Sequence, residues 1–222
     1  MKNILAKGGI EFLAVFLGIA LSLWVDDFRE EKELSNRIID DYQNIYSEVK
    51  SNILIIEEVI QLNKDINVSE EKILEILNGK MPYDQDSIIN LLANLNSLTF
   101  FGETSAHRTS VSSGRFNSSK DDELTKQISK LYEHNFVRLN KNGNWVDDVN
   151  HNLITQNPYL PFYAGIYEII NLDSLSIKQN FFGEKFQNNF LYFRFARSIY
   201  MMRLEETRNQ LYKVKNSIEY YY

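Results

Sequence analysis

The stretch FQNNFLYFRFARSIYMMRLEETRNQLYKVKNSI, residues 186–218, sets the architecture of the chain. Ten of its residues follow one another at alternating steps of four and three: Phe186, Phe190, Phe193, Arg197, Tyr200, Leu204, Thr207, Leu211, Val214 and Ile218. This heptad spacing predicts a helix from Glu184 to about Tyr220, with one side packed along a seam. Because such a seam needs long helical partners, the stretch predicts an antiparallel bundle.

The partner helix is predicted by an earlier stripe of apolar residues at helical spacing: Ile38, Tyr42, Ile45, Val49, Ile53, Ile56 and Ile60. Neither glycine nor proline occurs between Trp24 and Lys64. We therefore expect one continuous helix of about 55 residues, on the order of 80 Å long, running outward from the N-terminal region.

Shorter elements are expected between the long helices, in an insertion covering 66–119. Ser69, followed by two glutamates, indicates the N-cap of a short helix, and Asp86-Ser87 opens another over 88–98. In the polar stretch that follows, Gly114 of the Ser112-Ser113-Gly114 turn is expected to cap a further short helix.

A third long helix is expected from Lys120 to Thr155, ended by Asn157-Pro158. Phe162 to Asp173 is apolar and aromatic, which fits either a short helix or an extended lid. The fold class is therefore all-α: an antiparallel bundle of three long helices with a short helical insertion, occupying residues 26–222.

Residues 1–25 are expected to form a membrane anchor that continues into the first long helix. ILAKGGIEFLAVFLGIALSLWV spans residues 4–25 and carries no charge from Phe12 onward. These residues would make roughly 33 Å of helix, enough to cross a bilayer core if Lys7 reaches the head groups. A cleaved signal peptide, with Ala20-Leu21-Ser22 as the processing site, and a buried soluble helix are the alternatives. We expect an inner-membrane, single-pass protein with its bulk outside the cytoplasm, because the start resembles an uncleaved export signal.

One face of this segment carries Lys7, Glu11, Ala14, Gly18 and Ser22 at steps of four, three, four and four. Small residues at this spacing let two helices approach closely in lipid. The stripe thus predicts a homo-oligomer formed through the anchor. The alternative is that small residues are common in spanning helices, and that the lysine and glutamate only mark the interface.

Composition excludes several classes of function. The formal charge is −6, with 24 basic and 30 acidic residues, so nucleic acid is not an expected partner. Without cysteine, the chain has no disulfide, thiolate metal site or cysteine nucleophile. With 44% hydrophobic residues the soluble part can bury a core.

Two motifs resemble a known family. GIEFLAVFLGIALSL, residues 9–23, with the Val25-Asp26-Asp27-Phe28 junction, is similar to the anchor of a functionally uncharacterised bacterial family of single-pass membrane proteins. That family opens with G-x-E and V-x-x-G-I-x-x-A-L. TSVSSG, residues 109–114, with Leu124 beyond it, resembles the family's S-S-G turn. The resemblance implies a membrane anchor and a helical domain, and it implies no activity.

No catalytic, cofactor-binding or metal-binding residues are predicted. His107, His134 and His151 lack the spacing of metal ligands, and no nucleophile elbow or phosphate loop is present. Arg197 occupies a seam position where its charge would be buried. Its head group would either pair with a carboxylate such as Glu48 or Asp147, or recognise an anionic ligand or partner between helices.

Two functions remain open at this stage. The first is a membrane-anchored, non-catalytic interaction or scaffold protein of the bacterial envelope, with the lipid bilayer, further copies of itself and a protein as partners. The second is a membrane-tethered sensor or ligand-binding domain that signals through the juxtamembrane helix. An enzyme is not expected, because no acid, base or nucleophile constellation can be named.

Overall fold

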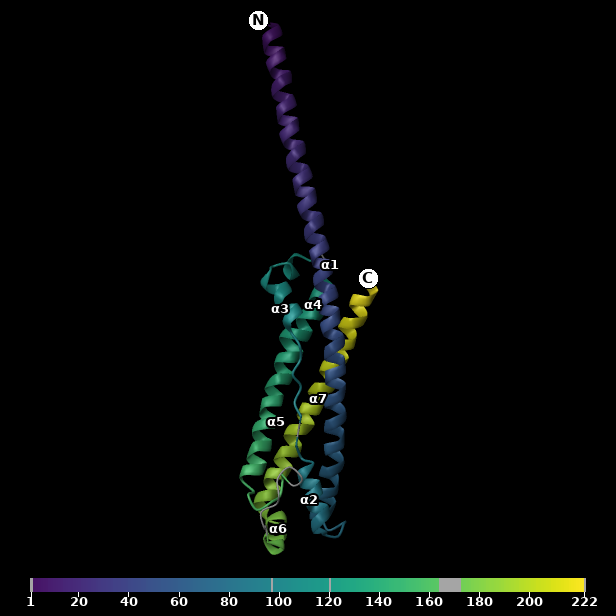
Figure 1. Cartoon of the computed structure of the whole chain (residues 1–222), viewed down its shortest axis with the longest axis vertical. Helices are drawn as coiled ribbons and strands as arrows, with labels where there is room; N and C mark the ends of the chain where they lie inside the picture. Colours follow the sequence, from purple (N-terminus) through teal and green to yellow (C-terminus); the bar gives the residue numbers. More distant parts are fainter. Residues whose placement is uncertain (1, 97, 120, 164–172, 222) are drawn as a thin grey trace.

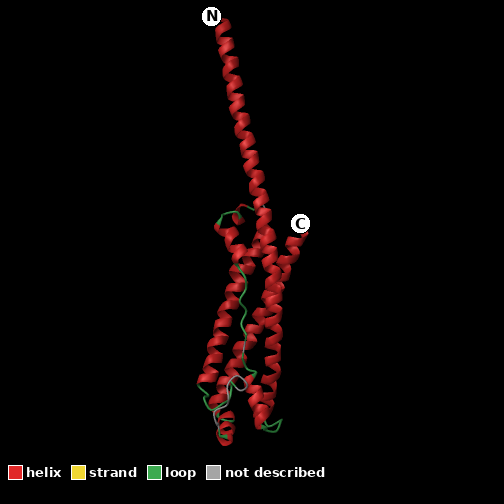
Figure 2. Cartoon of the chain, in the orientation of Figure 1, coloured by secondary structure: helices red, strands yellow, loops and turns green. Residues whose placement is uncertain are grey.

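The computed structural model describes residues 2–96, 98–119, 121–163 and 173–221, with side chains from Phe12 to Tyr220 within those ranges. These residues form helices and connecting loops without a strand (Figure 2), which confirms the all-helical bundle. The long elements are α1 (Lys2–Leu77), α5 (Val137–Thr155) and α7 (Glu184–Tyr221). The short ones are α2 (Gln85–Ala93), α3 (Ser105–Ser112), η1 (Phe116–Ser118), α4 (Asp122–Ser129), η2 (Lys130–Phe136) and α6 (Ser174–Phe181).

Helix α1 is longer than expected, with 76 residues in one unbroken element. The predicted helix start at Ser69 is wrong, because Ser69 lies inside α1 and is buried. Serine is tolerated within a helix when tertiary packing supplies the stabilisation. The true end comes at Gly79, whose φ of 70° stops the helix after Leu77.

The seam on α7 is confirmed, since all ten of its residues are buried. Helix α7 runs antiparallel to α1: Tyr46 near one end of the body donates to Glu219 at 2.5 Å, and Arg197 pairs with Glu70 near the other. Figure 1 shows the two helices side by side along the body. The stripe from Tyr42 to Ile60 is buried as predicted.

The third long element is a continuous helical stack of α4, η2 and α5, close to the predicted span. It also runs antiparallel to α7, with Ser217 donating to Gln127 at one end and Asn189 to Gln156 at the other. Its middle part, η2, is a π-helix that turns Tyr132 and Phe136 into the core. Sequence periodicity did not predict this segment.

An extended segment, 98–104, lies lengthwise in the groove between the long helices. Buried side chains bind its backbone. Asn52 donates to the carbonyl of Glu103 at 2.8 Å and accepts its N–H at 2.7 Å, while Asn63 donates to the carbonyl of Leu98 at 2.9 Å. The phenol oxygen of Tyr200 accepts the N–H of Phe100. These hydrogen bonds make the segment an integral part of the packed bundle.

Three of the short helices, α2, α4 and α6, have side-chain N-caps from aspartates. Asp84, two residues before the predicted Asp86, caps α2, and Asp173 caps α6, an element the sequence did not reveal. Gly114 has a φ of 77° directly after the C-cap of α3, which confirms its predicted capping role. The predicted helix or lid over 162–173 falls mostly outside the described residues.

The N-terminal part of α1 projects away from the bundle (Figure 1). No element among the described residues covers its apolar side chains: Phe12 is 72% exposed and Trp24 66%. Among the described residues, no helix is both long and apolar enough to cross a membrane. The uncharged run from Phe12 is closed by Asp26, and residues 4–11 of the predicted span lie outside the described side chains. The described part of the chain therefore does not support the expected span.

Candidate functional site

The inner face of α1 carries polar side chains among its apolar ones. The buried members are Asp41, Glu48, Asn52, Asn63, Ser69 and Glu70. Each of the carboxylates and amides in this set binds a different part of the chain. Together they bind α3, the turn after it, the segment before it and α7 to the inner face of α1, so they are the first candidates for a site.

Glu48 caps helix α3 from across the bundle. Its carboxylate accepts the backbone N–H of Ala106 at 2.7 Å and the hydroxyl of Ser105 at 3.2 Å. The N-cap residue Thr104 makes no side-chain cap of its own, so Glu48 takes over that task. The Tyr132 hydroxyl, from η2, donates to the same carboxylate at 2.7 Å. Burial next to this charge raises the pKa of Tyr132 far above its usual range, so Tyr132 stays a neutral donor.

His107 packs directly behind this cap. Its ring stacks on Tyr132 with 4.3 Å between centroids and meets Phe116 edge-on. The Nε2 atom is buried and has no hydrogen-bond partner among the described residues. Burial lowers the pKa of His107, while Glu133 and Glu48 oppose that shift. In the cluster as described, the ring of His107 is therefore packed between Tyr132 and Phe116.

Asp41 fixes the turn that contains the S-S-G motif. Arg115 donates to its two oxygens at 2.8 and 2.9 Å, and Ser110 adds a bond at 2.8 Å. The Arg115 guanidinium therefore holds the pKa of Asp41 below its usual value. Within the motif, Ser112 and Ser113 each donate to a backbone carbonyl three residues earlier. Ser112, Ser113 and Gly114 thus end a helix and carry no reactive group arrangement.

Arg197 lies in the first half of α7 and is 1% exposed. It forms an ion pair with Glu70 and donates to the carbonyl of Asn63 at 2.7 Å. Its partner is therefore neither of the suggested carboxylates, because Glu48 caps α3 and Asp147 accepts from Thr99 at 3.4 Å. Burial lowers the pKa of Arg197, and the adjacent Glu70 opposes this. Arg194, one turn before it, pairs with both Glu70 and Glu71.

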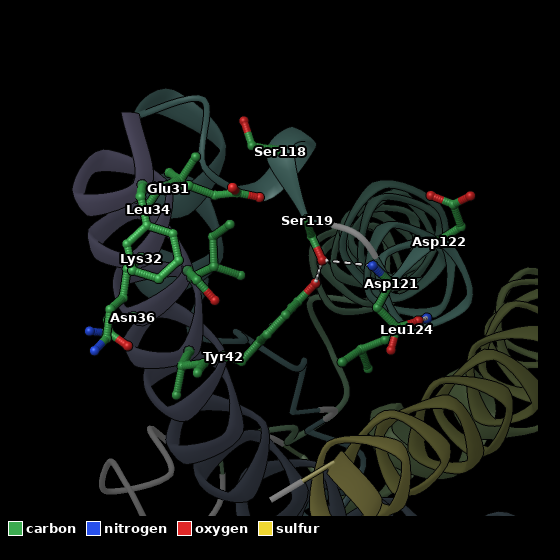
Figure 3. A pocket seen from close by; sticks show the side chains of 14 residues that line it. Glu31, Lys32, Leu34, Asn36, Tyr42, Ser118, Ser119, Asp121, Asp122 and Leu124 are labelled. Atoms are coloured by element: carbon green, nitrogen blue, oxygen red, sulfur yellow. Dashed lines mark hydrogen bonds between the residues drawn. The ribbon is translucent and has the colours of Figure 1, made fainter. Parts of the chain in front are cut away.

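A groove of about 930 Å³ lies where the projection of α1 meets the body (Figure 3). Leu34, Ile38 and Ile39 line it from α1, and Leu124 lines it from α4. At its back, Tyr42 donates to Ser119 at 2.6 Å, and Ser119 accepts the N–H of Asp121 at 3.2 Å. We call this the junction groove.

The residues of the predicted association stripe lie on the projection. Ala14, Gly18 and Ser22 are exposed, and a Cβ added at Gly18 would meet no atom within 4 Å. The side chains of Lys7 and Glu11 fall outside the described residues. The structure thus brings together only three of the five, on a face with no intramolecular partner among the described residues.

Sequence reasoning missed the polar inner face of α1. Its members keep helical register with the apolar stripe: Glu48 follows Ile45 by three residues and Asn52 by seven. The signal was therefore present, as polar residues at core positions. In the described part of the chain, no group of three or more His, Asp or Glu side chains could hold a metal ion.

Comparison with known proteins gives one match. A model of a family of unknown function, DUF6090, matches residues 11–182. No curated protein and no solved structure matches the chain. The match runs from the projecting part of α1 through the Glu48 and Asp41 contacts to the end of α6, and it is consistent with the expected uncharacterised family. The chain belongs to this family of unknown function, DUF6090.

Proposed function

We propose that the protein is a non-catalytic, membrane-anchored scaffold of the cell envelope. In this proposal the projecting part of α1 inserts into the bilayer, and the bundle offers surfaces to other proteins. The observation that carries it is the projection itself: Phe12 to Val25 is uncharged and exposed on all sides, and nothing in the described fold covers it. Exposed apolar surface of this extent marks a lipid or protein contact.

The polar interior supports a non-catalytic role. Glu48, Asp41 and Arg197 are each held by hydrogen bonds or ion pairs within the fold. A catalytic group must direct a reactive or hydrogen-bonding atom at a substrate, whereas the hydrogen bonds and ion pairs of these side chains join helices to one another. Arg197 pairs with Glu70 and donates to a backbone carbonyl, while its buried Nε atom has no hydrogen-bond partner among the described residues. Because the ion pair is made within the fold, the scaffold is favoured over a ligand sensor built on Arg197.

Self-association through Ala14, Gly18 and Ser22 is part of the proposal. Small residues one turn apart on an uncovered helix let a second backbone come close. Oligomerisation would set several bundles next to one another, which is what a scaffold requires.

The test is flotation of the full chain with lipid vesicles, followed by carbonate extraction. We expect the unaltered chain to float and to resist extraction. The double variant Leu17→Asp/Leu21→Asp should remain in the soluble fraction, because carboxylates in the apolar segment oppose insertion. Leu54→Asp is the matched control: Leu54 is 70% exposed on the body part of the same helix, so this variant should still float. A full chain that stays soluble in the presence of vesicles, or that is isolated with its N-terminus near Leu23, would overturn the proposal.

A further inference from the structure

A second groove lies on the outer surface between the α4–η2 stack and α7, with a volume of about 780 Å³. Lys126, Lys130 and Arg138 line it from the stack, and Lys213 lines it from α7. The lysines are one turn apart, and Arg138 follows just beyond the π-helix η2, so the stack contributes three cations to the groove. We call this the basic groove.

The four cations are not used within the fold. None of them forms an ion pair with any residue that the structure describes, whereas Arg115, Arg194 and Arg197 are all paired. Of the two carboxylates in the lining, Glu206 is already engaged by Arg203 at 2.6 Å, which leaves Glu133. The lining thus carries four cations against two carboxylates, an excess of positive charge in a chain whose net charge is −6. Charges of one sign gathered in a concave site attract ligands of the opposite sign.

The dimensions and lining favour a polypeptide. Lys126 and Lys130, four residues apart on a helix, are about 6 Å apart along its axis, and alternate residues of an extended peptide are about 6.6 Å apart, so carboxylates at every second position can reach both lysines. Ser129, Asn135 and Asn209 also line the groove and offer hydrogen-bonding groups to a peptide backbone. The lining has one aromatic ring, that of His134, and no Phe, Tyr or Trp side chain.

We propose that the basic groove is a docking site for an acidic, extended segment of a partner protein, with carboxylates at alternating positions. Lys126, Lys130, Arg138 and Lys213 would contact the carboxylates. The partner segment would lie along η2, antiparallel or parallel to it, and across the face of α7. This site is independent of membrane insertion, so its failure would leave the proposed function intact.

The experiment measures binding of a fluorescein-labelled peptide, four glutamates alternating with serines, to the full chain in detergent at low salt by fluorescence anisotropy. Lys130→Gln/Arg138→Gln should raise the Kd about tenfold. Lys141→Gln/Lys185→Gln removes the same charge from exposed positions outside the groove and should change the Kd less than twofold. Binding should weaken on raising the salt, as expected for screened surface charges. Circular dichroism melting of both double variants verifies that each is folded.

Three comparison probes complete the design: an alternating lysine–serine peptide, inorganic polyphosphate and a thymidine oligonucleotide of matched charge. The lysine peptide should not bind, and the two phosphate polymers should bind more weakly than the glutamate peptide. Absence of glutamate-peptide binding, or equal weakening by both double variants, would overturn the proposal. Phosphate polymers that bind as tightly as the peptide, with the same dependence on Lys130 and Arg138, would overturn it as well, because the groove would then be a general polyanion site.

Discussion

The backbone N–H of Phe100 donates to the phenol oxygen of Tyr200 across 2.7 Å, although the two residues are 100 positions apart. Tyr200 is fully buried in the seam of α7, and Phe100 belongs to the extended segment between the long helices. This bond ties the segment to the helix at the centre of the bundle. Burial raises the pKa of Tyr200 well above its usual range, so the phenol remains neutral at any physiological pH.

Tyr200→Phe should destabilise the protein by about 1–3 kcal/mol, because the buried N–H of Phe100 loses its acceptor while the packing volume is almost retained. Urea denaturation followed by circular dichroism measures the difference. Tyr212→Phe is the control, since Tyr212 bonds Glu57 on the surface and its loss should cost much less than the loss of the Tyr200 hydroxyl. Equal effects of the two changes would show that the segment is not held by Tyr200.

Breaking the buried pair from the Glu70 side should be more harmful than replacing the arginine. Glu70→Gln leaves the charge of Arg197 buried without its counter-charge, at a cost of about 3–5 kcal/mol. Arg197→Leu removes that charge and should be better tolerated. Thermal melting of both variants and of the double variant gives the coupling energy. The exposed pair Arg37–Glu33 serves as a reference and should contribute close to zero.

Gly102→Ala should destabilise the fold far more than Gly114→Ala. A Cβ at Gly102 would lie 2.7 Å from the ring of Phe100 and 2.8 Å from that of Phe136. At Gly114 there is open space, and the cost comes only from the φ of 77°, about 1 kcal/mol. Urea midpoints of the two variants test the ranking, and a smaller effect at Gly102 would contradict the close packing of segment 98–104.

His107 should make stability depend on pH in the weakly acidic range. Burial lowers the pKa of His107 in the folded state, so the unfolded chain binds more protons there and stability falls as pH drops below about 6.5. Asp41, whose pKa is also lowered, contributes a further loss only near and below its unfolded value of 3.8. His107→Phe, which retains the stack on Tyr132, should therefore lose less stability than the unaltered chain between pH 7 and pH 5. His134→Gln, at an exposed position, should behave like the unaltered chain. Identical pH profiles for His107→Phe and the unaltered chain would show that His107 does not titrate in this range.

The association stripe can be tested on the full chain in detergent. Single cysteines at Ala14, Gly18 and Ser22 should crosslink more strongly than cysteines at 13, 17 and 21. Gly18→Leu should weaken association more than Leu17→Ala or Leu21→Ala, because it blocks the close approach of two backbones. Crosslinks of equal strength at all six positions would indicate random collision.

The parts of the fold that depend on periodicity could be predicted. The seam on α7 and the stripe on α1 each have many residues at helical spacing. A glycine directly after a short helix, such as Gly114, indicates a C-terminal cap. Ser69 was misread because a serine before two glutamates is a cap signal in isolation, while packing of Ile66 and Ile73 on the core keeps the helix intact. The wrongly predicted helix start at Ser69 placed Glu70 on a separate short helix. For that reason the sequence did not identify Glu70 as the partner of Arg197.

The candidate sites depend on pairings that sequence spacing does not encode. Asn52 and Asn63 bond to backbone groups of an extended segment more than 30 residues away, and such contacts exist only after the helices have packed. The basic groove combines Lys126 and Lys130 with Lys213, which are separated in the chain by more than 80 positions. Neither feature produces a local pattern, so both required the structure.

The unbroken course of α1 fixes a rotational relation between its two ends. Gly18 and Ile45 are 27 positions apart, about seven and a half turns, so the small-residue face points away from the side on which the bundle packs. Leu54, 36 positions after Gly18 and thus about ten turns on, shares the outward side and is 70% exposed. Two chains that meet through Gly18 would therefore carry their bundles on the outside of the pair, back to back. Inserting one residue before Ile38 would swing each bundle by about 100° around that axis, while the α1 residues from Ile38 onward would keep their register with the body.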